Sequence, residues 1–251
     1  MIVEKFKDNR EFMKSRFKDD IVSDQDKDMK QPPLTKAFDS DGRIINLPQA
    51  NKNILRKKEL HECIDDRKSH REYIDCLISI DELAYLLWAT QGVSSIKGDN
   101  YATMRTVPSA GARHSFETYL AVNRVEGLQK GIYRYLPLDH QLIFIREEED
   151  IAEKITDGAL KQKFAGDAAV NFIWSCVPYR TEWRYSYRSH KVMLLDAGHV
   201  CQNLYSACEG LGLGTCAIAS YDQEIMDGLT EIDGEEEFVV YMAPVGRVTP
   251  K

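Results

Sequence analysis

This 251-residue sequence has no long apolar run and few residues that break regular structure. No segment reaches the roughly 18 consecutive apolar residues that a transmembrane helix requires. The first residues, MIVEKFKDNREF, carry charge from position 4 and contain no apolar stretch, so we expect no secretory signal. Glycine (15) and proline (8) are sparse while 43% of residues are hydrophobic, which excludes a fibre or a disordered chain. We therefore expect a globular cytoplasmic protein with no membrane partner.

Motifs for metal, nucleotide and hydrolase sites are also missing. The histidines form no HExxH motif, and the six cysteines form no CxxC pair: Cys63, Cys76, Cys176, Cys201, Cys208 and Cys216. We therefore expect no metal site, and free buried thiols in a reducing compartment. No GxGxxG loop heads a βαβ unit and no GxxxxGK[ST] occurs, which disfavours a Rossmann or P-loop site. The absence of GxSxG likewise disfavours a serine hydrolase.

The chain also lacks an excess of basic residues. The chain has 33 Lys and Arg against 40 Asp and Glu, giving a net charge of −7. Such a balance argues against a nucleic-acid partner, which usually meets a basic surface. It does not exclude a local site for one small anion.

The charge pattern separates a leading segment, residues 1–55, from a main domain, residues 56–251. The first 30 residues contain 16 charged side chains, and apolar residues recur among them at spacings of four and seven: Ile2, Phe6, Met13 and Phe17. This spacing predicts a helix with one apolar stripe. Residues 31–53, rich in Pro, Asn and Asp, predict a connecting arm. The alternative is a flexible leader without a packing role.

The main domain alternates between helical and strand patterns, which predicts an α+β fold. Helices are expected at 59–66, 80–91 with Ser79 as N-cap, 189–211 and 222–229, and strands at 117–123, 131–136, 141–145, 169–178, 214–219 and 238–245. The first three strands suggest an antiparallel meander. Between Val192 and Cys208 the long helix carries only one charge, Asp196. We expect it to be covered on most sides, in part by a second subunit.

One basic segment could bind a phosphate. Arg67, Lys68, Ser69 and Arg71 place three permanent cations and a hydroxyl within five residues. A phosphate requires several converging charge-assisted donors, and arginine offers a planar fork. The alternative is a solvated basic turn whose charges balance those of the neighbouring acidic residues.

Three further segments could contribute to a site. RTVPSAGARH at 105–114 has small residues that let a flat ligand approach the backbone closely, although an ordinary loop is equally compatible. WRYSYR at 183–188 precedes the long helix, and GLGLG at 210–214 follows it as a helix end. Gly246-Arg247 closes the last strand and supplies one more cation.

Together these segments resemble the nitroreductase family of FMN flavoproteins. The closer resemblance is to the SagB-type branch, which includes azoline dehydrogenases, and it rests on RTVPSAGARH, GLQKGIYRY, the aromatic-Arg-Tyr segment and DAGHVCQNLYSACEGLGLG in this order. It extends over residues 60–250 and loosely over the first 55. It implies a mixed central sheet flanked by helices, and a homodimer that shares each FMN across an extensive interface.

The resemblance also implies roles for particular residues. Arg67, Ser69, Arg71 and Arg247 would hold the FMN phosphate, with Lys68 as a helper and Gly246 beside Arg247. The loop Pro108, Ser109, Ala110 and Gly111, from the other subunit, would lie along the isoalloxazine ring. The backbone of Ala219 and Ser220 would donate an N–H toward flavin N5, which favours the reduced ring.

Three positions depart from the family patterns. Ala112 and Ala219 stand where many nitroreductases carry Asn and an acidic residue, and both fit the SagB-type branch better. Azoline dehydrogenases of that branch carry a Lys-Tyr pair proposed to remove a ring proton, where this chain has Arg184-Tyr185. Arginine is effectively never deprotonated and cannot act as that base. Tyr185 could still form a hydrogen bond at the flavin face, or only pack.

Three functions remain compatible with this resemblance. The leading hypothesis is an FMN oxidoreductase that takes hydride from NAD(P)H and reduces a small-molecule acceptor such as a quinone or nitroaromatic, with Arg184 and Tyr185 as candidate catalytic residues. The second is a SagB-type dehydrogenase that oxidises azoline rings in a modified peptide. The third is a non-catalytic flavin-fold subunit that binds or scaffolds partners.

Overall fold

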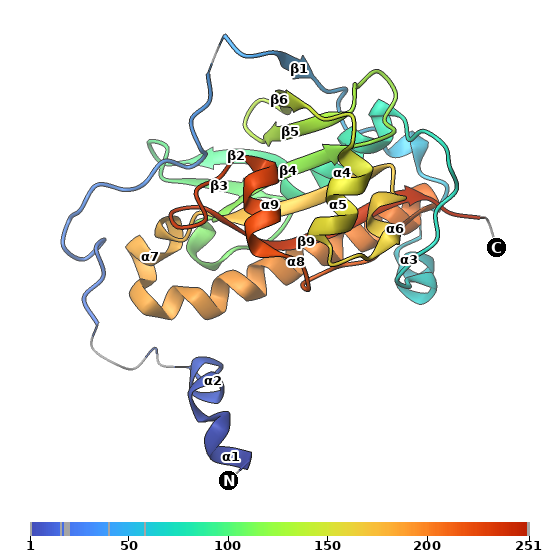
Figure 1. Cartoon of the computed structure of the whole chain (residues 1–251). Helices are drawn as coiled ribbons and strands as arrows, with labels where there is room; N and C mark the ends of the chain where they lie inside the picture. The colour runs from blue at the N-terminus through green and yellow to red at the C-terminus, as the bar shows by residue number, and fades with distance from the viewer. Residues whose placement is uncertain (1, 16, 18–20, 40, 58, 250–251) are drawn as a thin grey trace.

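A seven-stranded sheet runs through the centre of the computed structural model, which describes residues 2–15, 17, 21–39, 41–57 and 59–249 (Figure 1). Its strand order is β1-β6-β5-β4-β7-β9-β8. The strands span Ile44–Asn46 (β1), Phe116–Val122 (β4), Gly131–Leu136 (β5), Gln141–Glu147 (β6), Val170–Cys176 (β7), Leu213–Thr215 (β8) and Phe238–Arg247 (β9). The described strands β2 (Val93–Lys97) and β3 (Ala102–Arg105) form a separate hairpin. The α+β class and the meander of β4, β5 and β6 are confirmed.

Every strand pair of the central sheet is antiparallel, where a mixed sheet was expected. The reason lies in the connections. Residues 123–130 join β4 to β5 and residues 137–140 join β5 to β6, and both connections are too short for the crossover that a parallel neighbour requires. The one parallel contact among the described residues is an isolated bridge between Ile78 and Val125.

Alternating side chains along the central strands form two hydrophobic clusters, one on each face of the sheet. Leu120, Phe172 and Trp174 belong to the first, which packs against α4 (Ile80–Gln91) and α8 (Ser189–Leu211). Tyr119 and Ile173, their neighbours in sequence, belong to the second, which packs against α5 (Ile151–Gly158) and α9 (Gln223–Thr230). β4 and β7 are buried along their whole length, as expected for strands covered on both faces.

Helix α8 begins and ends where the sequence predicts. It ends because Gly212 adopts a left-handed conformation, with φ of 68°. Its partner α4 begins in a capping box, in which Ser79 and Glu82 each accept the other's backbone N–H. The chain itself covers α8 less completely than expected, since Leu194 and Leu195 are 53% and 55% exposed. Coverage by a second subunit stays a prediction.

The strand predicted at 214–219 stops earlier, at Thr215. The N–H of Ala217 donates to the Tyr205 hydroxyl at 2.8 Å rather than to a strand, and Ile218 rejoins β9 only through an isolated bridge to Met242. The remaining described helices are α3 (Leu60–Asp66), α6 (Lys163–Gly166) and α7 (Tyr179–Tyr185), with short 3₁₀ turns at 52–54, 110–112 and 186–188. Of these, only α3 was predicted.

The leading segment forms two short helices, α1 (Ile2–Lys5) and α2 (Lys7–Phe12), which extend away from the body (Figure 1). The single helix predicted through Phe17 is thus interrupted at Phe6. Phe6, Met13 and Phe17 are 42%, 62% and 46% exposed, so most of the predicted apolar stripe is uncovered.

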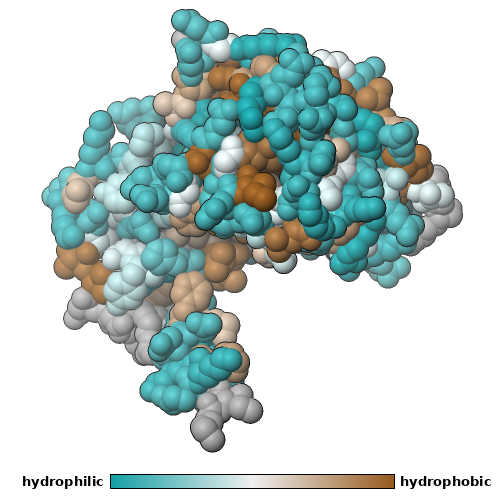
Figure 2. Space-filling model, in the orientation of Figure 1, coloured by the Kyte–Doolittle hydropathy of each residue, from teal (hydrophilic) through white to brown (hydrophobic). Residues whose placement is uncertain are grey.

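Residues 21–39 and 41–46 return to the body as a strap. The N–H of Gln25 donates to Trp183 O, and the Trp183 indole donates to Met29 O. Further along, the ammonium of Lys36 reaches Glu237, and β1 then pairs with the edge strand β6. The connecting arm therefore packs on the main domain. The face of the molecule in Figure 2 is mostly hydrophilic, with hydrophobic residues in separate patches.

None of the helices in the described ranges is both long and apolar enough to span a membrane.

Candidate functional site

The predicted phosphate-binding segment is an exposed, extended stretch that follows α3. Helix α3 ends at Asp66 with Arg67 as its C-cap, and the N–H of His70 then donates to Thr215 O of β8 at 2.9 Å. The side chains of Arg67, Lys68 and Arg71 are exposed, and none of them forms a salt bridge within the described part of the chain. These three charges are therefore available to an anion.

Tyr205 of α8 organises one end of this segment. Its hydroxyl lies 2.9 Å from Ser69 Oγ and accepts the N–H of Ala217, while the Arg67 guanidinium lies 5.5 Å from its ring centre. Arg71 turns elsewhere, 5.9 Å from the ring of Phe164. The sequence analysis did not identify Tyr205, because nothing in a long helix shows which side chain will meet residues 136 positions away.

Arg247 is held by an acid that the sequence analysis did not connect with it. Its Nη2 lies 2.9 Å from both carboxylate oxygens of Glu82, the residue that caps α4. Its Nη1 is buried and has no hydrogen-bond partner among the described residues. A buried donor without a partner is costly, so this nitrogen is one that a bound anion would satisfy. The backbone of Arg247 lies beside the basic segment, since its carbonyl accepts the N–H of Ile74.

Two glycines allow this close packing. A Cβ on Gly246 would lie 2.9 Å from the Tyr73 ring, and one on Gly214 would lie 2.7 Å from Cβ of His70. Any larger residue would push the basic segment away from β8 and β9. The structural role predicted for the glycines after α8 is thus seen at Gly214, and Gly246 has a comparable one.

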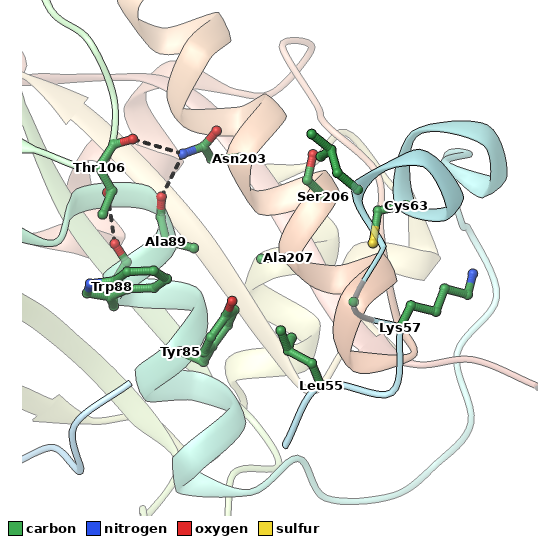
Figure 3. Close-up of a pocket in the computed structure, with 12 residues that line it drawn as sticks. Leu55, Lys57, Cys63, Tyr85, Trp88, Ala89, Thr106, Asn203, Ser206 and Ala207 are labelled. Atoms are coloured by element: carbon green, nitrogen blue, oxygen red, sulfur yellow. Dashed lines mark hydrogen bonds between the residues drawn. The ribbon is translucent and has the colours of Figure 1, made fainter. Parts of the chain in front are cut away.

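The predicted flavin loop is attached to α8 and α4. Asp196 accepts the N–H of Ala110 at 3.0 Å, and the Asn203 amide donates to Thr106 O and Ala89 O (Figure 3). Asp196 and Asn203 are seven residues, or about two turns, apart and therefore share one face of the helix. Burial raises the pKa of Asp196, while its hydrogen bonds with Ser109 and Ala110 oppose that rise.

The candidate catalytic pair lies directly on this loop. At Gly111, where φ is 60°, a Cβ would meet the Tyr185 hydroxyl at 2.7 Å and the Arg184 side chain at 2.8 Å. Arg184 Nη1 donates to the Tyr101 hydroxyl at 2.5 Å, and its guanidinium lies 5.6 Å from the Tyr185 ring. The structure therefore brings Gly111, Arg184 and Tyr185 together. Pro108 is exposed, whereas Ser109 and Ala110 are half-buried.

Within one chain, the loop and the basic segment do not meet. Asp196, which holds the loop, and Tyr205, which meets the basic segment, are nine residues apart on α8. Nine residues are two and a half turns, so the two side chains leave opposite sides of the helix, about 13 Å apart along its axis. Ala219 and Ser220 follow β8 and are exposed, and Ser220 O accepts a hydrogen bond from Gln162.

The described residues contain no cluster of three or more His, Cys, Asp or Glu side chains that could hold a metal ion. All six cysteines are free, and all except the half-buried Cys76 are buried.

Comparison with known proteins gives consistent matches. The sequence model of the nitroreductase family matches residues 64–247. A candidate nitroreductase of Methanocaldococcus jannaschii is 35% identical over 194 residues, 77% of this chain and 93% of that protein. The trifolitoxin-processing protein TfxB of Rhizobium leguminosarum bv. trifolii is 28% identical over 62% of this chain and 44% of its own length. A crystal structure of a candidate nitroreductase from Anabaena variabilis has a TM-score of 0.69 and 26% identity, over 83% of this chain and 42% of that one. The chain thus spans less than half the length of the last two.

Gly111→Ala tests the packing of the loop against Arg184 and Tyr185. The left-handed conformation alone costs an alanine about 1–2 kcal/mol, and the contacts at 2.7 and 2.8 Å add to that loss. We expect a fall of at least this size in the free energy of unfolding, measured by urea denaturation. Gly228→Ala in α9 is the control, because its Cβ would meet nothing within 4 Å. There we expect a gain of about 0.5–1 kcal/mol. Equal effects at both positions would contradict the close packing.

His114, which follows the loop, should make stability depend on pH. Burial and nearby arginines lower its pKa from 6.5 to about 3, and its Nε2 lies 3.1 Å from Thr103 O. The unfolded chain binds this proton first, so stability falls as pH drops from about 6.5 toward 3, by up to about 1.4 kcal/mol per unit. We expect His114→Gln to reduce this slope in urea denaturation between pH 4.5 and 7, and exposed His61→Gln to leave it unchanged. An unaltered slope in His114→Gln would refute a neutral buried imidazole.

Proposed function

Because the chain belongs to the nitroreductase family, we propose that this oxidoreductase binds FMN and uses NAD(P)H to reduce a quinone or nitroaromatic acceptor. The observation that supports it best is the group of cations around β8 and the end of β9, most of which are exposed and without an acidic partner among the described residues. Arg67, Lys68 and Arg71 have no acidic partner among the described residues, and Arg247 keeps one buried nitrogen unbonded. A phosphate dianion accepts several charge-assisted hydrogen bonds and fits such a set.

The bound flavin would supply hydride transfer, and the residues of this chain would bind and orient it. Arg67, Ser69, Arg71 and Arg247 would hold the phosphate, with Lys68 nearby. Tyr205 would keep Ser69 in place, and Glu82 would keep Arg247 in place. The Pro108–Gly111 loop would lie along the ring system, with the Tyr185 hydroxyl beside it. The backbone of Ala219 and Ser220 would offer an N–H to the ring.

We also propose that the working unit is a homodimer. In one chain the loop and the basic segment leave opposite sides of α8, so a loop from one protomer would complete the site on its partner. The face of α8 that carries Tyr205 is open for such an approach. Leu194, three turns from Tyr205, is 53% exposed, and a Cβ on Gly198 would meet nothing within 4 Å.

A second uncovered surface supports the dimer. A groove of about 380 Å³ lies between α4 and α8, lined by Leu55, Leu60, Tyr85 and Trp88 among others (Figure 3). Leu60 and Trp88 are 69% and 41% exposed. Large apolar side chains gathered on one side of a protein commonly mark an interface.

One observation favours a second function, azoline oxidation in a modified peptide. The similarity to TfxB, which is named for processing trifolitoxin, covers 62% of this chain. Against it stands Arg184, which cannot accept a proton as the lysine of azoline dehydrogenases is proposed to do. The two functions differ in direction, since azoline oxidation removes two hydrogens from the peptide and so delivers electrons to the flavin.

Purified protein should show flavin absorbance, either directly or after addition of FMN, and NADH or NADPH should bleach it without oxygen. Arg67→Ala and Arg71→Ala each remove a charge-assisted contact of about 1.5–3 kcal/mol, so each should weaken FMN binding at least about tenfold in a fluorescence titration.

Arg43→Ala is the control, because Arg43 also lies over an aromatic ring, Phe144, but at the β1–β6 edge of the sheet. It should leave the dissociation constant unchanged. Protein that stays colourless after FMN is added would rule out the proposed cofactor. Unchanged affinity in the Arg67→Ala, Arg71→Ala double variant would rule out the phosphate assignment alone.

A further inference from the structure

Two arginines beside the Pro108–Gly111 loop lack an acidic partner. Arg113 is 3% exposed, and its guanidinium lies between the rings of Tyr101 and Trp183, 4.8 and 5.6 Å from their centres. It donates to the carbonyls of Gly111 and Tyr101. Arg184 donates only to the Tyr101 hydroxyl among the described residues. Neither guanidinium forms an ion pair with any described carboxylate.

Acidic side chains of the segments that pack around this loop have other partners. Glu182 binds His190 at 2.7 Å, Asp24 binds Lys27 at 3.0 Å, and Asp196 accepts the loop N–H of Ala110. Asp26 accepts from the backbone N–H and hydroxyl of Ser23. The site beside the loop is therefore rich in positive charge that the described chain does not neutralise.

The two arginines differ in what they can still bind. Arg113 is enclosed by rings and carbonyls, and burial together with Arg184 lowers its pKa. Arg184 is only half-buried and, within the described part of the chain, uses one of its five N–H donors, which leaves a fork of its guanidinium open to a ligand. Such a fork matches the two oxygens of a carboxylate. Arg184 also packs against Gly111, so a carboxylate bound to it would be adjacent to a ligand on the loop.

Aromatic side chains surround this position. Tyr185 lies beside Arg184, the edge of Phe17 meets the Tyr185 ring with centres 6.1 Å apart, and Tyr101 closes the other side. An acceptor that combines a planar ring with a carboxylate would meet both the rings and the cation.

We propose that Arg184 binds the carboxylate of an aromatic acid, which is the electron acceptor or a close analogue of it. This proposal rests on the proposed function for the reaction itself. It adds that the acceptor carries a negative charge. Arg184 binds substrate here and takes part in no proton transfer, which its permanently charged side chain could not support.

The test compares two acceptors that differ in charge, 4-nitrobenzoate and 4-nitrobenzyl alcohol, with FMN-loaded protein. We expect kcat/KM to favour 4-nitrobenzoate, and Arg184→Gln to reduce the ratio of the two values about tenfold or more, mainly through KM. Arg184→Lys, which keeps the charge but loses the fork, should restore part of the ratio. Arg43→Gln, at the far edge of the sheet, should leave it unchanged. A wild-type ratio near one, or an equal loss for both acceptors in Arg184→Gln, would overturn the proposal.

Calorimetric titration with benzoate distinguishes the absence of the carboxylate site from a failure of the proposed function. It needs no turnover, so it reads the carboxylate site even if the protein reduces neither acceptor. Binding that is present in the native protein and lost in Arg184→Gln supports the site. Benzoate binding that is absent, or equal in both proteins, overturns it.

Discussion

The arrangement of the whole site depends on helix α8. Its polar side chains project from two opposite faces, and each face holds a different segment of the site. Asp196 and Asn203 hold the Pro108–Gly111 loop on one face, and Tyr205 meets the basic segment on the opposite face. The helix has almost no charge between Val192 and Cys208 and buries one side against α4 and the sheet, while Leu194 and Leu195 stay exposed. The geometry also separates two segments that must converge if both bind one flavin. The second copy of the chain that we propose would remove that conflict without any rearrangement of the first.

Uncompensated positive charge is the second constraint. The chain is acidic overall, yet Arg67, Lys68 and Arg71 meet no described carboxylate, and neither do Arg113 and Arg184. Elsewhere the same chain pairs its buried charges closely, as Arg180 and Glu117 do at 2.5 Å. Of these five cations only Arg113 is buried, whereas Arg67, Lys68 and Arg71 are exposed and Arg184 is half-buried, so these four remain accessible to anions that bind from outside. The net charge argues against a nucleic-acid surface, whereas the local clusters of positive charge leave room for small anions.

Local patterns predicted most of the central fold. The strand at 131–136 and the helix at 189–211 have the predicted bounds, because turn glycines and the helical repeat act within a few residues. The hairpin of β2 and β3 escaped prediction, since VSSIK alternates poorly and is mostly exposed. The strand after Gly214 was predicted too long because the Tyr205 hydroxyl takes the N–H of Ala217 away from the sheet. The second error comes from a side-chain contact that no strand pattern contains.

The candidate site shows the same division. The residue types that suit a phosphate were evident in sequence, but Glu82 and Tyr205, which contact Arg247 and Ser69, were not. Glu82 shows why. In sequence it is the capping partner of Ser79, and only the fold brings Arg247 from the far end of the chain to its carboxylate. One carboxylate thus links the start of α4 to the end of β9, so the position of the last predicted phosphate ligand depends on a helix cap 165 residues away.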